Sequence, residues 1–169
     1  MKILFLDFDG VLHPEGVYRQ PISGRIFLEK KYADEGHKLF EHANLLVELI
    51  EKSNVDVQIV LSTSWVSVLR SFKKVKQKLP AKLQEKVTSA TWHSAMDNQI
   101  FGRLTRYQQI MRFVERNNVS DSDWVAIDDN NYKWNEKHQN NLLHTNEVLG
   151  LGKSETQQEL VLKLKGEWK

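Results

Sequence analysis

The chain has 169 residues, of which 40% are hydrophobic and 27% are charged, a formal net charge of +2 and no cysteine. These values are typical of one globular domain, and the lack of cysteine excludes disulfides, thiolate metal sites and a thiol nucleophile. The net charge is too small to indicate a nucleic-acid partner by itself. No apolar run is long enough to span a membrane, and the short apolar start lacks the features of a secretory signal, so we expect a cytoplasmic protein without a membrane partner.

Two acidic residues end the first predicted strand. The apolar run at residues 2–6 stops at Asp7 and Asp9, and Gly10 follows. This pattern is typical of a buried parallel strand that delivers carboxylates to its carboxyl end, where ligands bind in open α/β sheets. Two carboxylates held this close repel each other unless a cation or a shared proton relieves them. A solvated turn is the alternative, but we interpret the pair as part of a functional site.

Residues 13–38 interrupt the pattern. The segment is polar and contains Pro14, Pro21 and three glycines. Long inserts of this kind in compact domains are usually functional or disordered. Because the segment directly follows the acidic pair, we predict a flap over the site, with a mobile surface loop as the alternative. The six histidines show no metal-binding spacing, and only His13 lies close enough to Asp9 in the sequence to interact with it.

Apolar runs and helical stripes alternate along the rest of the chain. Further strands are predicted at residues 55–61, 86–91, 124–127 and 141–144. Apolar residues recur at helical spacing within residues 39–50, 65–79, 107–114 and 160–164. Two helix starts have the spacing of a capping box, Thr105 with Gln108 and Ser154 with Gln157. The alternation predicts an α/β fold: a three-layer, Rossmann-like parallel sheet with helices on both faces, in a single domain over residues 1–169 with the flap as a minimal cap.

Hydroxyl and basic side chains are expected at the same end of the sheet as the acidic pair. The predicted strand at residues 55–61 is followed by Ser62 and Thr63, whose hydroxyls could donate to an anionic oxygen or could only cap the next helix. With Thr105 as N-cap, Arg106 is the first residue of its helix. Its guanidinium could pair with a phosphate oxygen and with the carboxylates, and a simply exposed arginine is the alternative.

A second pair of acidic residues, Asp128 and Asp129, follows the apolar run at residues 124–127. For this pair taken alone, an Asx-type turn is an equally good interpretation. Together with Asp7 and Asp9, however, four carboxylates on two strands that could be neighbours resemble a site for Mg²⁺, which prefers oxygen ligands.

The order of these motifs resembles a known family. A strand with DFDGVL, a strand with LSTSW, a basic helix start and a strand with IDD are similar to the motifs of the haloacid dehalogenase (HAD) superfamily of phosphatases. The start DFDGVLHP, the LSTSW segment and the pair Gly150 and Leu151 look most like the HAD domains of RNA-repair-like (Swiss Army Knife) proteins. The resemblance implies a Mg²⁺-dependent phosphate monoester hydrolase that acts through a phospho-aspartate intermediate.

The resemblance also implies catalytic and phosphate-binding roles. Asp7 would be the nucleophile and Asp9 the general acid–base. Ser62, with Thr63 beside it, would bind the transferred phosphoryl group. Arg106 would stand where the family commonly has lysine, and its forked guanidinium differs from the point charge of an ammonium group.

The metal implied by the resemblance is Mg²⁺. Asp7, the backbone carbonyl of Asp9 and the carboxylate of Asp128 would hold it, with Asp129 assisting through water. The expected partner is a phosphorylated substrate, either a small molecule or a nucleic-acid end.

Two alternative functions stay open. The basic stretch at residues 70–86 could follow a nucleic-acid backbone, as in a nucleic-acid end-processing phosphatase, although the solvated face of an amphipathic helix explains it as well. Tyr132 and Trp134 could stack on a base, although tryptophans are expected mainly in the core. The other alternative is a non-catalytic phosphate- or Mg²⁺-binding module. The presence of both Asp7 and Asp9 argues against it, because a pure binding module does not need the second acid.

Overall fold

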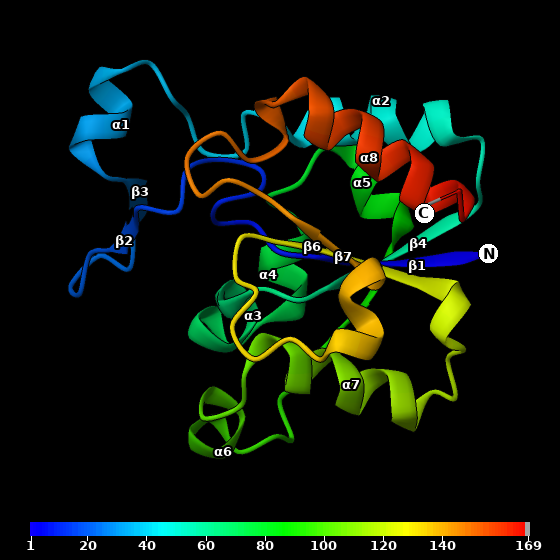
Figure 1. Ribbon diagram of the computed structural model, residues 1–169. Coiled ribbons are helices and arrows are strands. Elements are labelled where there is room, and N and C mark those ends of the chain that lie inside the picture. The colour runs from blue at the N-terminus through cyan, green and yellow to red at the C-terminus, as the bar shows by residue number, and fades with distance from the viewer. Residues whose placement is uncertain (168–169) are drawn as a thin grey trace.

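The computed structural model describes residues 1–167 and contains a five-stranded parallel sheet with the strand order β5-β4-β1-β6-β7 (Figure 1). The strands are β1 (Lys2–Leu6), β4 (Val57–Leu61), β5 (Val87–Ala90), β6 (Trp124–Asp128) and β7 (Leu142–His144). All five strands predicted from the sequence are confirmed, and their ends lie within two residues of the predicted ends. The strand that carries the first acidic pair is the central one.

Helices cover both faces of this sheet (Figure 1). On one face, α2 (Ala43–Ser53) and α8 (Ser154–Lys165) pack against each other, and α7 (Arg106–Arg116) covers the opposite face. Successive residues of β1 divide the core between the two faces: Leu4 packs in the cluster with α2 and α8, and Phe5 packs in the cluster with α7. Both side chains are fully buried, which contributes about 1.5–3 kcal/mol each. The three-layer α/β fold is therefore confirmed, with a buried core on both faces of β1.

The register of the three middle strands aligns the residues that follow them. The ladder pairs Leu6 with Leu61 of β4 and with Ile127 of β6. The next position on each strand holds Asp7, Ser62 and Asp128. The backbone continues the ladder there, since Asp7 N–H donates to the Ile127 carbonyl and Ser62 N–H donates to the Leu6 carbonyl. Three polar side chains therefore end three neighbouring strands in one row.

Two helices differ from the sequence prediction. The prediction of one helix over residues 65–79 is wrong, because Arg70 adopts a left-handed conformation (φ 48°) and Ser71 caps a new helix. The helix predicted from residue 39 begins only at Ala43, after Phe40, which is also left-handed (φ 60°).

No helix among residues 1–167 is long and apolar enough to cross a membrane. The remaining short helices are α3 (Ser64–Leu69), α4 (Phe72–Lys76), α5 (Ala81–Lys86) and α6 (Asn98–Gly102), with 3₁₀ turns at Asp121–Asp123, Glu136–Asn141 and Gly150–Gly152.

Only one of the two predicted capping boxes forms. The Thr105 side chain accepts from the Gln108 backbone, and the Gln108 side chain accepts from the Thr105 backbone, as predicted. The box at Ser154 is wrong, because Lys153 is the N-cap of α8. The Gln157 side chain donates instead to backbone carbonyls of the preceding turn.

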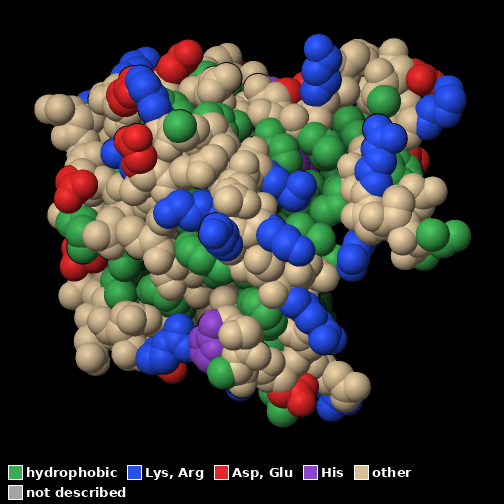
Figure 2. Space-filling model, turned by 180° about the vertical axis from the view of Figure 1, so that it is seen from behind, with side chains coloured by type: hydrophobic (Ala, Val, Ile, Leu, Met, Phe, Trp, Pro, Cys, Tyr) green, Lys and Arg blue, Asp and Glu red, His purple; other side chains and the backbone are tan. Residues whose placement is uncertain are grey.

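Residues 13–38, hereafter the cap, project from the carboxyl end of the sheet (Figure 1). The segment is not irregular: a β-hairpin and a one-turn helix are formed by β2 (Val17–Arg19), β3 (Ile26–Leu28) and α1 (Lys30–Asp34). The hairpin reaches back to the body of the molecule, where Arg19 Nη1 donates to the Val68 carbonyl of α3 (3.4 Å). Hydrophobic side chains line the hollow between this lobe and the body (Figure 2).

Candidate functional site

Three carboxylates converge at the carboxyl ends of β1 and β6. One oxygen each of Asp7, Asp128 and Asp129 lies within 4.8 Å of the others. Asp7 and Asp128 are buried, and Asp129 is half-buried. The turn after β1 allows this approach, because Gly10 is left-handed (φ 71°) and a Cβ atom there would lie 2.3 Å from Asp129 Oδ2. The local sequence therefore brings two acidic loops together at one point.

The environment disfavours the charged form of all three carboxyls. Burial raises the pKa of Asp7, the Arg106 guanidinium opposes this, and Asp9 adds to it. Burial also raises the pKa of Asp128 well above its usual range, and the charge of Asp7 adds to this. Burial, together with Asp7, raises the pKa of Asp129 to about 7. A cluster of this kind is stabilised by any cation that binds among its oxygens.

Among the described residues, Arg106 is the one positively charged side chain that contacts the three carboxylates. It is the first residue of α7, and its position follows from the capping box at Thr105. Its Nε atom lies 2.9 Å from Asp128 Oδ2, and its Nη2 atom lies 3.4 Å from Asp7 Oδ2. Burial alone would lower the pKa of Arg106, but Asp7 and Asp128 raise it, so the guanidinium stays charged. The structure thus brings Arg106 to the carboxylates with which the sequence analysis pairs it.

The two hydroxyls after β4 have different surroundings. Thr63 is the N-cap of α3, where its side chain accepts from the Trp65 N–H, and the same side chain weakly favours the charged form of Asp7, which lowers the pKa of that carboxyl. Ser62 is buried beside Asp7, and its Oγ atom has no hydrogen-bond partner among residues 1–167. Buried hydroxyls are rarely left without a partner, so an unpaired one at this point is available to a ligand oxygen.

Asp9 lies apart from the cluster of carboxylates. Its Oδ1 atom accepts from the indole N–H of Trp65 (2.8 Å) and lies 3.0 Å from Nε2 of His13. The Nδ1 atom of His13 accepts from the Phe40 N–H (3.0 Å). The sequence position of His13 predicts a contact with Asp9, whereas Trp65, like the other tryptophans, is predicted in the core. The only sequence signal for Trp65 is its position, two residues after the hydroxyl that caps α3.

Three pockets surround these side chains. Asp9 borders a pocket of about 150 Å³ between the hairpin and α3, and also an acidic pocket of about 350 Å³ that contains Glu15, Asp129 and Glu147. A third pocket, of about 400 Å³, lies beside Arg106 and contains Arg103 and Tyr132. Asp9 can therefore be reached from the hairpin side and from the acidic side, Asp129 from the acidic side, and Arg106 from the α7 side.

The tryptophan and tyrosine that follow the second acidic pair differ in exposure. Tyr132 is 61% exposed and lines the pocket beside Arg106. Trp134 is buried in the cluster with α7, and its indole N–H donates to the His138 carbonyl. Tyr132 is thus accessible to a ligand, whereas Trp134 packs in the core.

The basic stretch at residues 70–86 does not form one helical face. Its lysines spread over α4, α5 and the turns beside them, and Lys and Arg side chains are scattered among uncharged ones on this side (Figure 2). Lys76 donates to the Val87 carbonyl, Lys82 pairs with Glu51, and Lys78 lies over the Trp65 ring. Several of these charges therefore have intramolecular partners.

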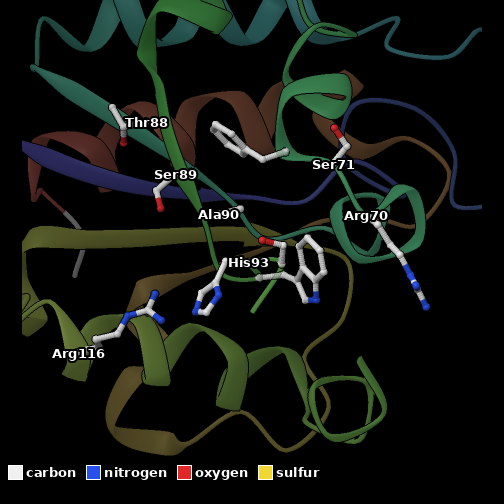
Figure 3. Close-up of a pocket in the computed structure, with 10 residues that line it drawn as sticks. Arg70, Ser71, Thr88, Ser89, Ala90, His93 and Arg116 are labelled. Atoms are coloured by element: carbon white, nitrogen blue, oxygen red, sulfur yellow. The ribbon is translucent and has the colours of Figure 1, made fainter. Parts of the chain in front are cut away.

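A further pocket, of about 410 Å³, lies along β5 at the edge of the sheet (Figure 3). Arg70, Ser89, His93 and Arg116 line it. It shares no lining residue with the three pockets around the carboxylates, and none of its lining residues is acidic. Its charged lining consists of two arginines, Arg70 and Arg116.

Comparison with known proteins identifies the family. A family model described as the HAD domain in Swiss Army Knife RNA repair proteins matches residues 3–156. This range contains the sheet except for Lys2, the cap and every residue of the site described above. Searches of curated proteins and of solved structures found no match.

Proposed function

The chain belongs to the HAD superfamily, and we propose that it is a Mg²⁺-dependent phosphate monoester hydrolase with a phospho-aspartate intermediate on Asp7. Its family within the superfamily is that of the HAD domains in Swiss Army Knife RNA repair proteins, and the superfamily in general consists of phosphatase-type hydrolases. The observation that carries the proposal is the pairing of two different carboxylates. Asp7 is buried next to a fixed guanidinium, and Asp9, two residues away, is partly exposed and held by N–H donors.

The residues of the site fit Mg²⁺. Carboxylate oxygens are its preferred protein ligands, and Asp7, Asp128 and Asp129 bring three of them within 4.8 Å. The raised pKa values of the same three groups indicate an excess of negative charge that Arg106 alone does not neutralise. Asp7 and Asp128 would hold the ion, with Asp129 beside it. When bound, the ion supplies positive charge that lets an anionic phosphate approach a carboxylate nucleophile.

The first half of the reaction uses both acids. A carboxylate oxygen of Asp7 attacks the phosphorus atom, and the bond from phosphorus to the leaving oxygen breaks. Asp9 donates its proton to that oxygen, so the product leaves as a neutral alcohol. Arg106, which contacts Asp7, and the unpaired Ser62 hydroxyl donate hydrogen bonds to the phosphoryl oxygens, and the Thr63 side chain favours the charged form of Asp7.

The second half restores the enzyme. Water attacks the phosphorus atom of phosphorylated Asp7, and Asp9, now a carboxylate, takes the proton of the water. Inorganic phosphate and the Asp7 carboxylate are released, and Asp9 is protonated again. The acidic pocket beside Asp9 gives water a route to this position.

Hydrolysis of p-nitrophenyl phosphate in excess EDTA and after addition of Mg²⁺ tests this proposal. We expect no turnover with EDTA and full recovery with Mg²⁺. A matched control is Asp56→Asn, which removes an exposed carboxylate before β4, at the opposite end of that strand from Ser62, and should change nothing. Undiminished turnover in EDTA would contradict the mechanism, and binding of phosphate and Mg²⁺ without turnover of any ester would favour a non-catalytic module.

A nucleic-acid end is the second candidate substrate, and the hairpin favours it more than the basic stretch does. Tyr18 and Phe27 are exposed side by side on the hairpin, with ring centroids 6.1 Å apart. Tyr18 and Arg19 line the pocket that reaches Asp9. Exposed aromatic rings next to an arginine suit stacked bases of a single strand. The name of the matching family, which refers to RNA repair, agrees with this substrate class.

A panel of substrates separates the two classes. Oligonucleotides with a 3′- or 5′-phosphate and small phosphorylated metabolites are compared by kcat/KM. If the hairpin binds bases, Tyr18→Ala should lower kcat/KM for the oligonucleotide and leave p-nitrophenyl phosphate unchanged. Equal effects on both substrates would argue for a small-molecule phosphatase.

A further inference from the structure

One oxygen of Asp9 is held by two donors from different parts of the fold. Both the indole N–H of Trp65 and Nε2 of His13 contact Oδ1, at 2.8 and 3.0 Å. Within residues 1–167, no hydrogen bond reaches Oδ2. The second oxygen is therefore the one left for a reacting group, and the Asp9 side chain is 27% exposed.

The backbone fixes which nitrogen of His13 carries the proton. The N–H of Phe40 donates to Nδ1 (3.0 Å), so Nδ1 must be unprotonated and Nε2 must carry the hydrogen that is donated to Asp9. Phe40 adopts a left-handed conformation (φ 60°), which is unfavourable for a residue with a large side chain and persists only where the surroundings enforce it. His13 is fully buried. Both donors to Asp9 are thus neutral groups.

Aromatic packing keeps the two donors in place. The rings of Phe40 and Trp65 contact each other, and each also contacts the rings of Phe8 and His13, with centroid distances from 5.1 to 5.9 Å. Edge-to-face contacts of this kind restrict ring rotation as well as burying surface. His13 is the first residue of the cap and Phe40 follows two residues after its end, so both ends of the cap are connected to Asp9 through His13.

We propose that His13 and Trp65 are positioning residues for Asp9. By holding Oδ1, they direct Oδ2 towards the oxygen of the leaving group in the first half-reaction and towards the attacking water in the second. The proton moves from Oδ2 to the leaving oxygen and later from water back to Oδ2, while Oδ1 accepts two hydrogen bonds throughout. The inference rests on the proposed function, and it adds the cap and α3 to the groups on which proton transfer depends.

The benefit of this arrangement is geometric. A carboxyl group can rotate about its bond to the side chain, and each misdirected orientation lowers the fraction of molecules that can transfer the proton. General acid–base catalysis contributes about 10²–10⁴-fold, so loss of orientation should remove part of that factor and no more. A purely structural role for His13 and Trp65 would instead lower stability and affect every step of the reaction.

Single-turnover kinetics with two esters separate these possibilities. Nitrophenolate leaves without a proton, whereas the alkoxide of β-glycerol phosphate needs one. In Trp65→Phe, which keeps the ring but removes the N–H, we expect the first turnover of β-glycerol phosphate to slow by about 10-fold. The burst of nitrophenolate from p-nitrophenyl phosphate should stay unchanged. The matched control Trp92→Phe removes another buried indole N–H, which donates to Asn98 outside the site, and should leave both esters unchanged.

Two substitutions of His13 test the same point with opposite results. The amide of His13→Gln extends about as far as Nε2 and can donate to Asp9, whereas that of His13→Asn reaches only the position of Nδ1. We expect glutamine to keep most of the activity on β-glycerol phosphate and asparagine to lose it. In the Asp9→Asn background, neither Trp65→Phe nor His13→Asn should reduce the rate further, because the group that they orient is gone.

The outcomes are distinct. Equal losses on both esters, full activity of both variants, or a further loss in the Asp9→Asn background would overturn the positioning role. If the parent enzyme hydrolyses neither ester, the proposed function fails and the positioning role fails with it. If the parent is active and Asp9→Asn alone is slow, failure of the variants concerns the positioning role only.

Discussion

The site has two halves, and each surrounds an aspartate with different partners. In the ionic half, Asp7 lies among Asp128, Asp129 and the Arg106 guanidinium. In the cap half, the two donors to Asp9 among residues 1–167, His13 and Trp65, are neutral groups. The function of Asp7 depends on neighbouring charges and on a bound cation, whereas the function of Asp9 depends on the direction of two N–H bonds. Two aspartates two residues apart can therefore perform different steps because the fold gives them different partners.

The largest expected effect is in the ionic half. Asp7→Asn should abolish turnover, because an amide cannot form the phosphorylated intermediate. The variant should unfold at a temperature no lower than the parent in the absence of metal, since the pKa of Asp7 is raised in the folded state and a neutral side chain relieves repulsion. Turnover assays and thermal unfolding in EDTA check this. Residual turnover above the level of a mock preparation would contradict the role of Asp7.

The second effect is in the cap half. Asp9→Asn should lower steady-state turnover by about 10²–10⁴-fold, the usual contribution of general acid–base catalysis. Binding of Mg²⁺ should persist, because the side chain of Asp9 lies outside the three-carboxylate cluster. Calorimetry with Mg²⁺ measures the binding. If turnover matched that of the parent, the distinction between the halves would be wrong.

A third experiment tests the shape of the cation in the ionic half. Arg106 contacts Asp7 and Asp128 through two different nitrogens, which the single ammonium group of lysine cannot reproduce. We expect Arg106→Met to lower kcat by about 10²–10³-fold, as for loss of one donor to a transition-state oxygen. Arg106→Lys should lose less. If lysine and methionine were equally poor, fork geometry rather than charge would be the essential property.

Stability as a function of pH probes the ionic half without catalysis. Between pH 3.8 and about 7, folded Asp129 keeps a proton that the unfolded chain has lost, so the free energy of unfolding falls as the pH rises through this window. The raised pKa values of Asp7 and Asp128 act in the same direction. The melting temperature in EDTA should therefore decrease from about pH 5 to about pH 8, and Mg²⁺ should raise it more at the higher pH. Asp129→Asn should flatten the slope, and a melting temperature that rises with pH would contradict the assignment.

The smallest effect is expected outside both halves. Lys73→Glu with Lys74→Glu changes charge on α4, where the structure shows a dispersed basic surface. We expect oligonucleotide and small-ester hydrolysis to respond alike to this change and to salt. A loss confined to oligonucleotides, with a log–log salt slope of about −0.7 for each contacted phosphate, would show that a nucleic-acid backbone crosses this face.

Much of the fold could be predicted because strand signals are local. Apolar runs that end at acidic or hydroxyl residues located all five strands, and the capping box located Arg106 at the start of α7. The break at Arg70 was missed because apolar periodicity continues through it, and only a left-handed residue and a new cap reveal it. The structure of the cap was also missed, since two three-residue strands carry too little pattern to distinguish them from a loop.

The ionic half could be predicted more fully than the cap half for a physical reason. Asp7, Asp128 and Arg106 stand at the ends of regular elements, where register fixes their place. The donors of the cap half depend on the side-chain direction of Trp65 and on the backbone N–H of Phe40, which no sequence spacing specifies. Sequence spacing therefore does not predict these long-range contacts between a loop, the cap and the start of a helix, and only the three-dimensional structure reveals them.

The most direct test of the account uses Asp9→Asn and p-nitrophenyl phosphate in the presence of Mg²⁺. Nitrophenolate leaves without a proton, so Asp7 should still be phosphorylated, while the missing base should prevent water from removing the phosphoryl group. Rapid acid quenching, proteolysis and mass spectrometry should then find one phosphoryl group on the peptide that contains Asp7, in nearly stoichiometric amount. Phosphorylation at any other residue, or release of one nitrophenolate per enzyme without a modified peptide, would contradict the central claim.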